Sequence, residues 1–256
     1  MIYILIFLGL LAFLGYVIKT TQPKPVADFP KHWHAILDNH VLYYKKLSPD
    51  EQLRFQKKMM HFLNEVIIEG VHLTIVETDT ILIAASAVIP IFGFDQWQYT
   101  NLSTVLLYPD YFDEDLQFTG VPSENRRIAG MVGSGRFDKQ MILSKKALYH
   151  GFENKTDKNN TAIHEFVHLM DKSDGVIDGI PKNLLQHTYA IPWLELMHTK
   201  MIEIDTDSSD IRAYGGTNKA EFFAVASEYF FERPDLLKRK HPELYALLAK
   251  CFQQEI

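Results

Sequence analysis

Two histidines and a glutamate stand within five consecutive residues, in the stretch TAIHEFVHLMD from Thr161 to Asp171. His164 and His168 are four residues apart. On an α-helix, residues at that spacing differ by about 40° in direction and about 6 Å in height. Both imidazole rings would therefore project from one face toward one point, as two of the ligands of a tetrahedral zinc ion must do.

Glu165 follows the first of these histidines and would lie about 100° around the helix from it. That angle is too wide for a natural third ligand, but it allows the carboxylate to reach a water molecule on the metal. Glu165 could then accept a proton as the water attacks a carbonyl group, and pass it to the leaving amine. Zinc would lower the pKa of the water toward about 7 and polarise the carbonyl oxygen.

The surroundings of the motif favour a metal site over an ordinary helix. With 11 histidines in 256 residues, a chance His-Glu-x-x-His pattern is expected on the order of 0.03 times per chain. Polar groups on a largely buried helix must be paired or metal-bound, because unpaired burial costs several kcal/mol. The residues that make this helix apolar around most of its circumference are Ala162, Ile163, Phe166, Val167, Leu169 and Met170.

Further polar residues could complete such a site. A catalytic zinc ion needs a third protein ligand and one open position, whereas four protein ligands make a structural site. The segment AYGGTNKAEFFAVASEYFFERP offers Glu221 and Glu228, seven residues apart and thus roughly 10 Å apart along one helix face. Only one can reach the metal, and spacing does not choose between them. Asp171, one turn after His168, would either orient that imidazole or serve as a helix-surface residue or local cap.

The segments NTAIHEFVHLMD and AYGGTNKAEFFAVASEYFF together resemble the Mlc titration factor A family of zinc-dependent peptidases, which are similar to the catalytic domain of lethal factor. The likeness extends upstream to IAASAVIPIFGF, to VLLYPDYF and to the glycine-containing segment that ends in MILS. It therefore covers most of residues 31–253. The resemblance implies a zincin-like fold, aminopeptidase-like hydrolysis of peptides, and binding of a transcriptional repressor as a protein partner.

The resemblance also implies roles for five residues. His164, His168 and Glu221 would be the zinc ligands, and Glu165 would be the general base. Tyr214 would place its phenol where it can hydrogen-bond the developing oxyanion. The ordinary alternatives are a solvated helix-surface carboxylate for Glu221 and a packing residue of a glycine-containing loop for Tyr214.

The first residues form a separate apolar segment. From Ile2 to Val17 the chain reads IYILIFLGLLAFLGYV, with no charge before Lys19, and as a helix it would cover roughly 25 Å. Because no basic region precedes it and no A-x-A-like cleavage site follows, an uncleaved membrane anchor is favoured over a signal peptide or a buried helix. The lysines that follow predict a short N-terminus outside and a C-terminal domain in the cytoplasm, at the inner membrane.

The remaining sequence predicts a single α+β metallopeptidase domain over residues 31–256, mainly helical with a small sheet. A linker with three prolines, residues 20–30, would join it to the anchor of residues 1–19. The expected elements are one amphipathic helix from Trp33 to Leu47, a helix capped at Ser48 and ending near Asn64, strands VHLTIV at Val71 and TVLLYP at Thr104, a hairpin from Arg127 to Ser144, and helices starting near Asn160, Lys182, Lys219 and Pro242. Periodicity leaves ILIAASAVIPIF open between helix and strand.

Composition excludes some partners and leaves a second function open. The net charge of −6, from 26 basic and 32 acidic residues, argues against nucleic acid, which requires a basic face. Cys251 is the only cysteine, so no internal disulfide can form. The alternative to an enzyme is a membrane-tethered protein that sequesters a cytoplasmic transcriptional regulator, with zinc in a structural role.

Overall fold

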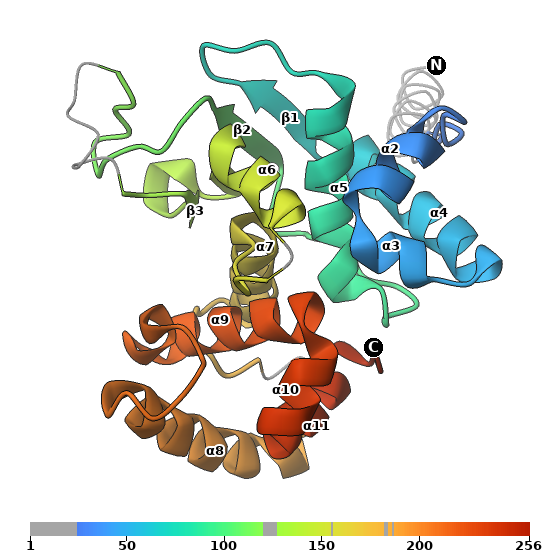
Figure 1. Ribbon diagram of the computed structural model, residues 1–256. Coiled ribbons are helices and arrows are strands. Elements are labelled where there is room, and N and C mark those ends of the chain that lie inside the picture. The colour runs from blue at the N-terminus through green and yellow to red at the C-terminus, as the bar shows by residue number, and fades with distance from the viewer. Residues whose placement is uncertain (1–24, 120–126, 155, 182–183, 186) are drawn as a thin grey trace, which may run out of the picture.

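The computed structural model describes residues 25–119, 127–154, 156–181, 184–185 and 187–256 (Figure 1). The expected membrane anchor and the first part of the proline-containing linker lie outside these residues. Among the helices that are described, none is long and apolar enough to cross a membrane.

Four short strands between residues 67 and 144 form one mixed sheet. Across the sheet they run β1 (Ile67–Gly70), β2 (Thr104–Tyr108), β4 (Gln140–Ser144) and β3 (Gly130–Val132). Strands β1, β2 and β4 run parallel to one another, and β3 pairs antiparallel with β4. The hairpin expected between Arg127 and Ser144 is confirmed, and it places β3 at an edge of the sheet.

Helices pack around the sheet and make up most of the second half of the chain (Figure 1). The helices described before residue 154 are α2 (Trp33–His40), α3 (Leu42–Lys46), α4 (Pro49–Glu65), α5 (Glu77–Ile91) and α6 (Lys145–Glu153). Those of the second half are α7 (Thr161–Asp171), α8 (His187–Asp205), α9 (Lys219–Glu232), α10 (Pro234–Lys240) and α11 (Pro242–Phe252). The fold is therefore mainly helical α+β with a small sheet, as expected.

The expected single helix from Trp33 to Leu47 is instead two helices. They are separated at Val41, whose backbone is extended with φ −104° and ψ 91°. Val41 is buried, as are Leu37 before the break and Tyr44 after it. A β-branched residue accepts an extended backbone readily, and the break allows both short helices to direct side chains into the same core.

The expected strand at Val71 is also wrong, because the strand lies earlier. β1 begins at Ile67, one residue beyond the C-cap of α4, and ends at Gly70. His72 then adopts a left-handed backbone with φ 56°, which turns the chain away from the extended path. Side chains do not signal such a turn clearly here, so the apolar run by itself predicts the strand four residues too late.

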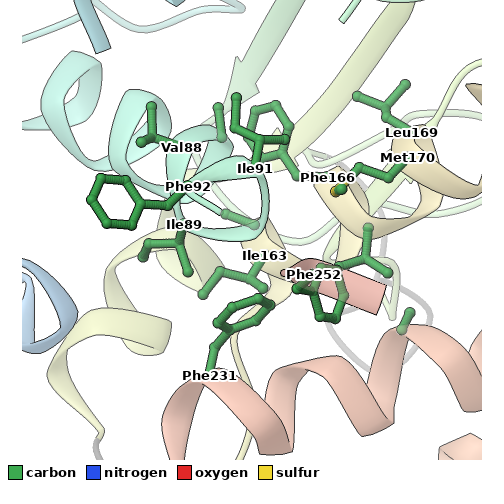
Figure 2. Packing of buried hydrophobic residues seen from close by; sticks show 14 of the residues in the cluster. Val88, Ile89, Ile91, Phe92, Ile163, Phe166, Leu169, Met170, Phe231 and Phe252 are labelled. Carbon is green, nitrogen blue, oxygen red and sulfur yellow. The ribbon is translucent and has the colours of Figure 1, made fainter. Parts of the chain in front are cut away.

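Helices α5 and α7 form the centre of the core (Figure 2). The segment ILIAASAVIPIF, left open by its periodicity, is helical, and every residue from Ile81 to Ile91 is buried. Figure 2 shows side chains from α5, α7, α9 and α11 packed together, including Val88, Ile89, Ile163, Phe166, Phe231 and Phe252. Helix α7 is thus held between the first-half helices and the C-terminal helices, which restrains its rotation and its position along the axis.

Candidate metal centre

Helix α7 presents the three residues of the His-Glu-x-x-His motif from within the core. Its N-cap is Asn160, whose side-chain oxygen accepts a hydrogen bond from the backbone N–H of Ile163 at 3.2 Å. His164 and Glu165 are each 6% exposed, and His168 is 7% exposed. The apolar neighbours pack against α5, so the polar stripe of α7 faces the opposite side, toward α9 and β3.

The two histidines and Glu221 converge on one point. His164 Nε2 lies 3.0 Å from His168 Nε2, and Glu221 Oε2 lies 2.9 Å from the first of these nitrogens and 3.5 Å from the second. Two imidazole nitrogens facing one another repel unless a proton or a cation lies between them. Two imidazoles and a carboxylate form a donor set that zinc adopts in catalytic sites, with a fourth position open. These residues can therefore hold a metal ion.

Helix α9 begins in a way that directs Glu221 at the histidines. Its N-cap is Asn218, whose side-chain oxygen accepts a hydrogen bond from the backbone N–H of Glu221 at 3.0 Å. Glu221 therefore occupies the first turn, where the helix packs across α7 (Figure 1). Burial tends to raise the pKa of Glu221, but its hydrogen bonds with His164 and His168 outweigh this effect and hold that pKa well below its usual range.

Glu228 contacts His164 at the ring nitrogen that Glu221 does not contact. Its side chain is fully buried, and Oε1 lies 2.8 Å from His164 Nδ1. Burial alone would lower the pKa of His164, but the nearby carboxylates of Glu228 and Glu221 raise it to about 10. Of the two glutamates that spacing could not distinguish, Glu221 faces both Nε2 atoms, and Glu228 faces Nδ1 of one ring.

Glu165 lies beside the convergence point and against the edge strand. Its nearest feature on β3 is Gly130, where a Cβ atom would come within 2.7 Å of the Glu165 Cγ. Burial raises the pKa of Glu165, although the neighbouring His164 and His168 oppose that shift. Two cavities meet at this residue, with volumes of about 720 Å³ and 240 Å³. Glu165 therefore has open space on two sides.

Tyr214 lies across the same opening. It belongs to a single 3₁₀ turn, Ala213–Gly216, that immediately precedes α9. Its ring centroid is 6.0 Å from that of His164, and its hydroxyl lies near the Glu221 carboxylate. The side chain is 52% exposed and lines both cavities. A tyrosine that only packed the loop would be covered, whereas this one presents its ring to the open space.

Comparison with known proteins places the chain in a family. A family model described as glucose-regulated metallo-peptidase M90 matches residues 18–253. The chain belongs to this family. It is 31% identical over 233 residues to an uncharacterized protein of Synechocystis sp., covering 87% of this chain and 84% of that protein.

Proteins named Mlc titration factor A are also similar to this M90 family member. The one from Yersinia enterocolitica is 27% identical, and the one from Enterobacter sp. is 28% identical. Each alignment covers 93% of this chain and 90% of the relative. The resemblance carried by the two motif segments is therefore confirmed over nearly the full length.

Asp171 does not make a described hydrogen bond to the imidazole of His168. Its Oδ2 accepts instead from the backbone N–H of Gly179 at 2.7 Å. Burial raises the pKa of Asp171 to about 6, although this hydrogen bond opposes the shift. His168 Nδ1 is buried and has no hydrogen-bond partner among the residues that the structure describes. Asp171 therefore anchors the loop that follows α7. His164 Nδ1 has a carboxylate partner, whereas His168 Nδ1 has none among the described residues.

Three residues near the site carried no recognisable signal in the sequence. Asn160 was expected only as a helix start, yet its backbone N–H donates to Glu228. Arg212 donates to Glu228 through a guanidinium nitrogen, although it stands outside the quoted motif. Gly130 was one of several glycines in a hairpin. Each acquires its role through a contact distant in sequence, which periodicity cannot report.

Proposed function

We propose that this M90 family member is a zinc-dependent peptidase that hydrolyses peptide bonds. The observation that carries the proposal is the convergence of His164 Nε2, His168 Nε2 and Glu221 Oε2 within 4.8 Å, with Glu165 beside them. Membership of a metallo-peptidase family supports it independently. Zinc fits two imidazoles and one carboxylate with a fourth position left open.

The residues of the site have separate roles in this proposal. His164, His168 and Glu221 hold the metal. Zinc bound there supplies a Lewis acid that polarises a carbonyl oxygen and favours ionisation of water. Glu165 accepts the proton of the attacking water and returns it to the leaving amine. Its location between two cavities supports this role, because attacking water and scissile bond must both lie within its reach.

Tyr214 is proposed to stabilise the charge that develops on the carbonyl oxygen. Its ring stands beside His164 and its hydroxyl lies near Glu221, at the edge of the candidate metal centre. A phenol placed there can donate a hydrogen bond to an oxyanion, and such donors contribute on the order of 10²-fold or more to catalysis. The exposed ring can move toward a bound substrate without displacing core side chains.

The mode of cleavage proposed is aminopeptidase-like, following the family resemblance. The two cavities flanking Glu165 give a substrate room on both sides of the scissile bond. Peptides with a free or an acetylated N-terminus, otherwise identical, separate the modes. Cleavage restricted to free N-termini supports aminopeptidase action, whereas equal cleavage of both identifies an endopeptidase.

The test of the enzyme proposal uses the full chain and its Glu165→Gln variant. We expect about one zinc ion per wild-type chain and hydrolysis of a peptide panel. Glu165→Gln should keep the zinc but lose the hydrolysis, because the proton acceptor is gone while the three ligands remain. Full activity in Glu165→Gln, together with indifference of the wild type to chelation, would sink the proposal.

The second proposed function, binding of a transcriptional regulator, rests on the names of two relatives. The proteins from Yersinia enterocolitica and Enterobacter are named Mlc titration factor A, which suggests that this chain binds a transcriptional regulator. Purified Mlc offered to the immobilised chain tests this. Retention that survives both Glu165→Gln and chelation would mean that binding is separate from peptide hydrolysis, and no retention would remove this candidate.

The proposed setting is the cytoplasmic side of the inner membrane. Residues 1–19 are proposed as the anchor, residues 20–30 as the linker and residues 31–256 as the peptidase domain. The apolar run and the lysines after it support this. A reporter fused after Ile256 should be active only in the cytoplasm, and activity in the exported compartment would reverse the topology.

A further inference from the structure

We propose that Glu228 is a positioning residue for the metal centre, which fixes the orientation of the His164 ring and is itself held by Arg212. This inference rests on the proposed function, because it assumes that His164 binds a metal through Nε2. Glu228 stands seven residues after Glu221 on α9. One helix would therefore supply both a ligand and the support for a ligand on the neighbouring helix.

Glu228 joins α9 to the first turn of α7 through both carboxylate oxygens. Oε2 accepts a hydrogen bond from the backbone N–H of Asn160 at 2.5 Å. Oε1 lies 2.8 Å from His164 Nδ1. The carboxylate thus holds the N-cap of the helix and the first histidine of the motif together. Any rotation of α7 or of the imidazole would break one of the two contacts.

The chemistry of a bound histidine gives this contact a function. When Nε2 binds a metal, Nδ1 carries the proton and donates it to a hydrogen-bond acceptor. A carboxylate acceptor fixes the tautomer, aligns the ring and makes Nε2 a stronger donor toward the metal. The other motif histidine has no such partner in the described residues, since His168 Nδ1 is buried without one. Of the two motif histidines, His164 is therefore the one whose ring a described carboxylate orients, and that carboxylate belongs to Glu228.

Arg212 allows a fully buried carboxylate to exist at this position. An ionised carboxylate out of contact with water is costly unless it is paired and hydrogen-bonded. The guanidinium of Arg212 donates to Oε1 of Glu228, and its side chain is 27% exposed. The arginine therefore reaches from the surface to the buried carboxylate. It neutralises the charge and limits the positions that the carboxylate can take.

The test compares the full-length wild type with Glu228→Gln and with a matched control on the same helix. Glutamine keeps the shape of the side chain but has one oxygen in place of two, so it cannot serve both His164 and Asn160. Glu232→Gln is the control, because Glu232 contacts the side chain of Asn160 at 3.2 Å one turn later. Among the described residues, Glu232 makes no hydrogen bond to His164.

Zinc affinity is measured by competition with a chelator, and the spectrum of the cobalt-substituted protein reports the ligand geometry. We expect Glu228→Gln to weaken zinc binding on the order of 10- to 100-fold and to alter the cobalt spectrum. The turnover number should fall while KM changes little, because the bound metal is misaligned and substrate contacts remain. Glu232→Gln should leave all three readouts within about threefold of wild type, as expected for a residue with no contact to a ligand.

A shorter carboxylate provides a second variant if Glu228→Gln does not fold. Glu228→Asp keeps the negative charge beside Arg212 but withdraws the oxygens by roughly 1.5 Å. It should also weaken zinc binding and change the cobalt spectrum. Normal zinc affinity, cobalt spectrum and turnover in the folded variants would overturn the proposal and leave Glu228 a purely structural residue.

Two other results would be equally decisive. Zinc retained by Glu221→Gln but lost in Glu228→Gln would make Glu228 the third ligand and overturn the positioning role. A wild-type chain that binds no zinc would instead overturn the proposed function itself. The two failures are therefore distinguishable, because only the second affects the protein before any substitution is made.

Discussion

Gly130 on β3 lies directly against Glu165 on α7. A methyl group at position 130 would come within 2.7 Å of the Glu165 Cγ and 2.9 Å of its Oε1. Real Cβ atoms do not approach other atoms this closely, so the glutamate would have to move. The absence of a side chain at position 130 therefore determines where the proposed proton acceptor can lie.

Replacement of this glycine should reduce activity without removing the metal. We expect Gly130→Ala to lower the turnover number on the order of 10- to 100-fold, because small displacements of a catalytic group are costly. Zinc content should stay near the wild-type value, since the displaced group is not a ligand. The control is Gly135→Asn in the same hairpin, at a φ of 58° with nothing within 4 Å, a conformation that asparagine tolerates. Equal activity in the two variants would contradict the role assigned to this contact.

Removal of the third ligand should abolish the stabilisation that bound zinc gives to the folded protein. Chelation should lower the melting temperature of the wild type and of Glu165→Gln alike, because both lose a ligand that binds only the folded state. Glu221→Ala should bind little zinc and should show no chelator-dependent shift. Lys219→Ala, a change in the same turn of α9, should behave as the wild type. A normal shift in Glu221→Ala would mean that the metal is held elsewhere.

Loss of the tyrosine hydroxyl should affect turnover more than binding. We expect Tyr214→Phe to lower the turnover number roughly 10- to 100-fold with little change in KM, because an oxyanion donor acts mainly in the transition state. Zinc content should be unchanged. The ring of Tyr214 is half exposed, so the variant should fold normally. A variant that raises KM alone would indicate that Tyr214 serves only in substrate binding.

Glu232 should make the stability of the protein depend on pH. Burial raises the pKa of Glu232 from 4.5 to about 7, although a hydrogen bond from Asn160 opposes the shift. Between these values the folded state binds more protons than the unfolded state, so stability falls as the pH rises. The protein loses no stability through Glu232 below about pH 4.5, and the loss is complete above about pH 7.

Substitution of Glu232 should remove this dependence. We expect Glu232→Gln to be more stable than the wild type at pH 8 by about 2 kcal/mol, and similar to it at pH 4.5. Urea denaturation at the two pH values measures the difference. A variant that is less stable at pH 8 would mean that Glu232 is stabilised by its surroundings when ionised.

The elements most accurately predicted were those whose signals are local. The capping box of Ser48 and Glu51 marks the start of α4, where the Glu51 carboxylate accepts hydrogen bonds from the backbone N–H and the hydroxyl of Ser48. The hairpin and the helix around the histidines were predicted equally well, because each pattern lies within one short stretch of the chain. The break at Val41 and the position of β1 were missed. Both depend on which side chains the rest of the core accepts, and the local sequence does not carry that information.

The spacing of His164 and His168 is enough to place both on one helix face, because residues four apart on an α-helix differ by only about 40° in direction. The sequence could not decide between Glu221 and Glu228, which lie on the same face of α9. Tertiary structure made that choice, because the way α9 crosses α7 brings the first turn of α9 to the Nε2 atoms and places Glu228 behind one ring. Helix crossing is set by packing between residues more than fifty positions apart, whereas ligand spacing within a helix is set by backbone geometry alone.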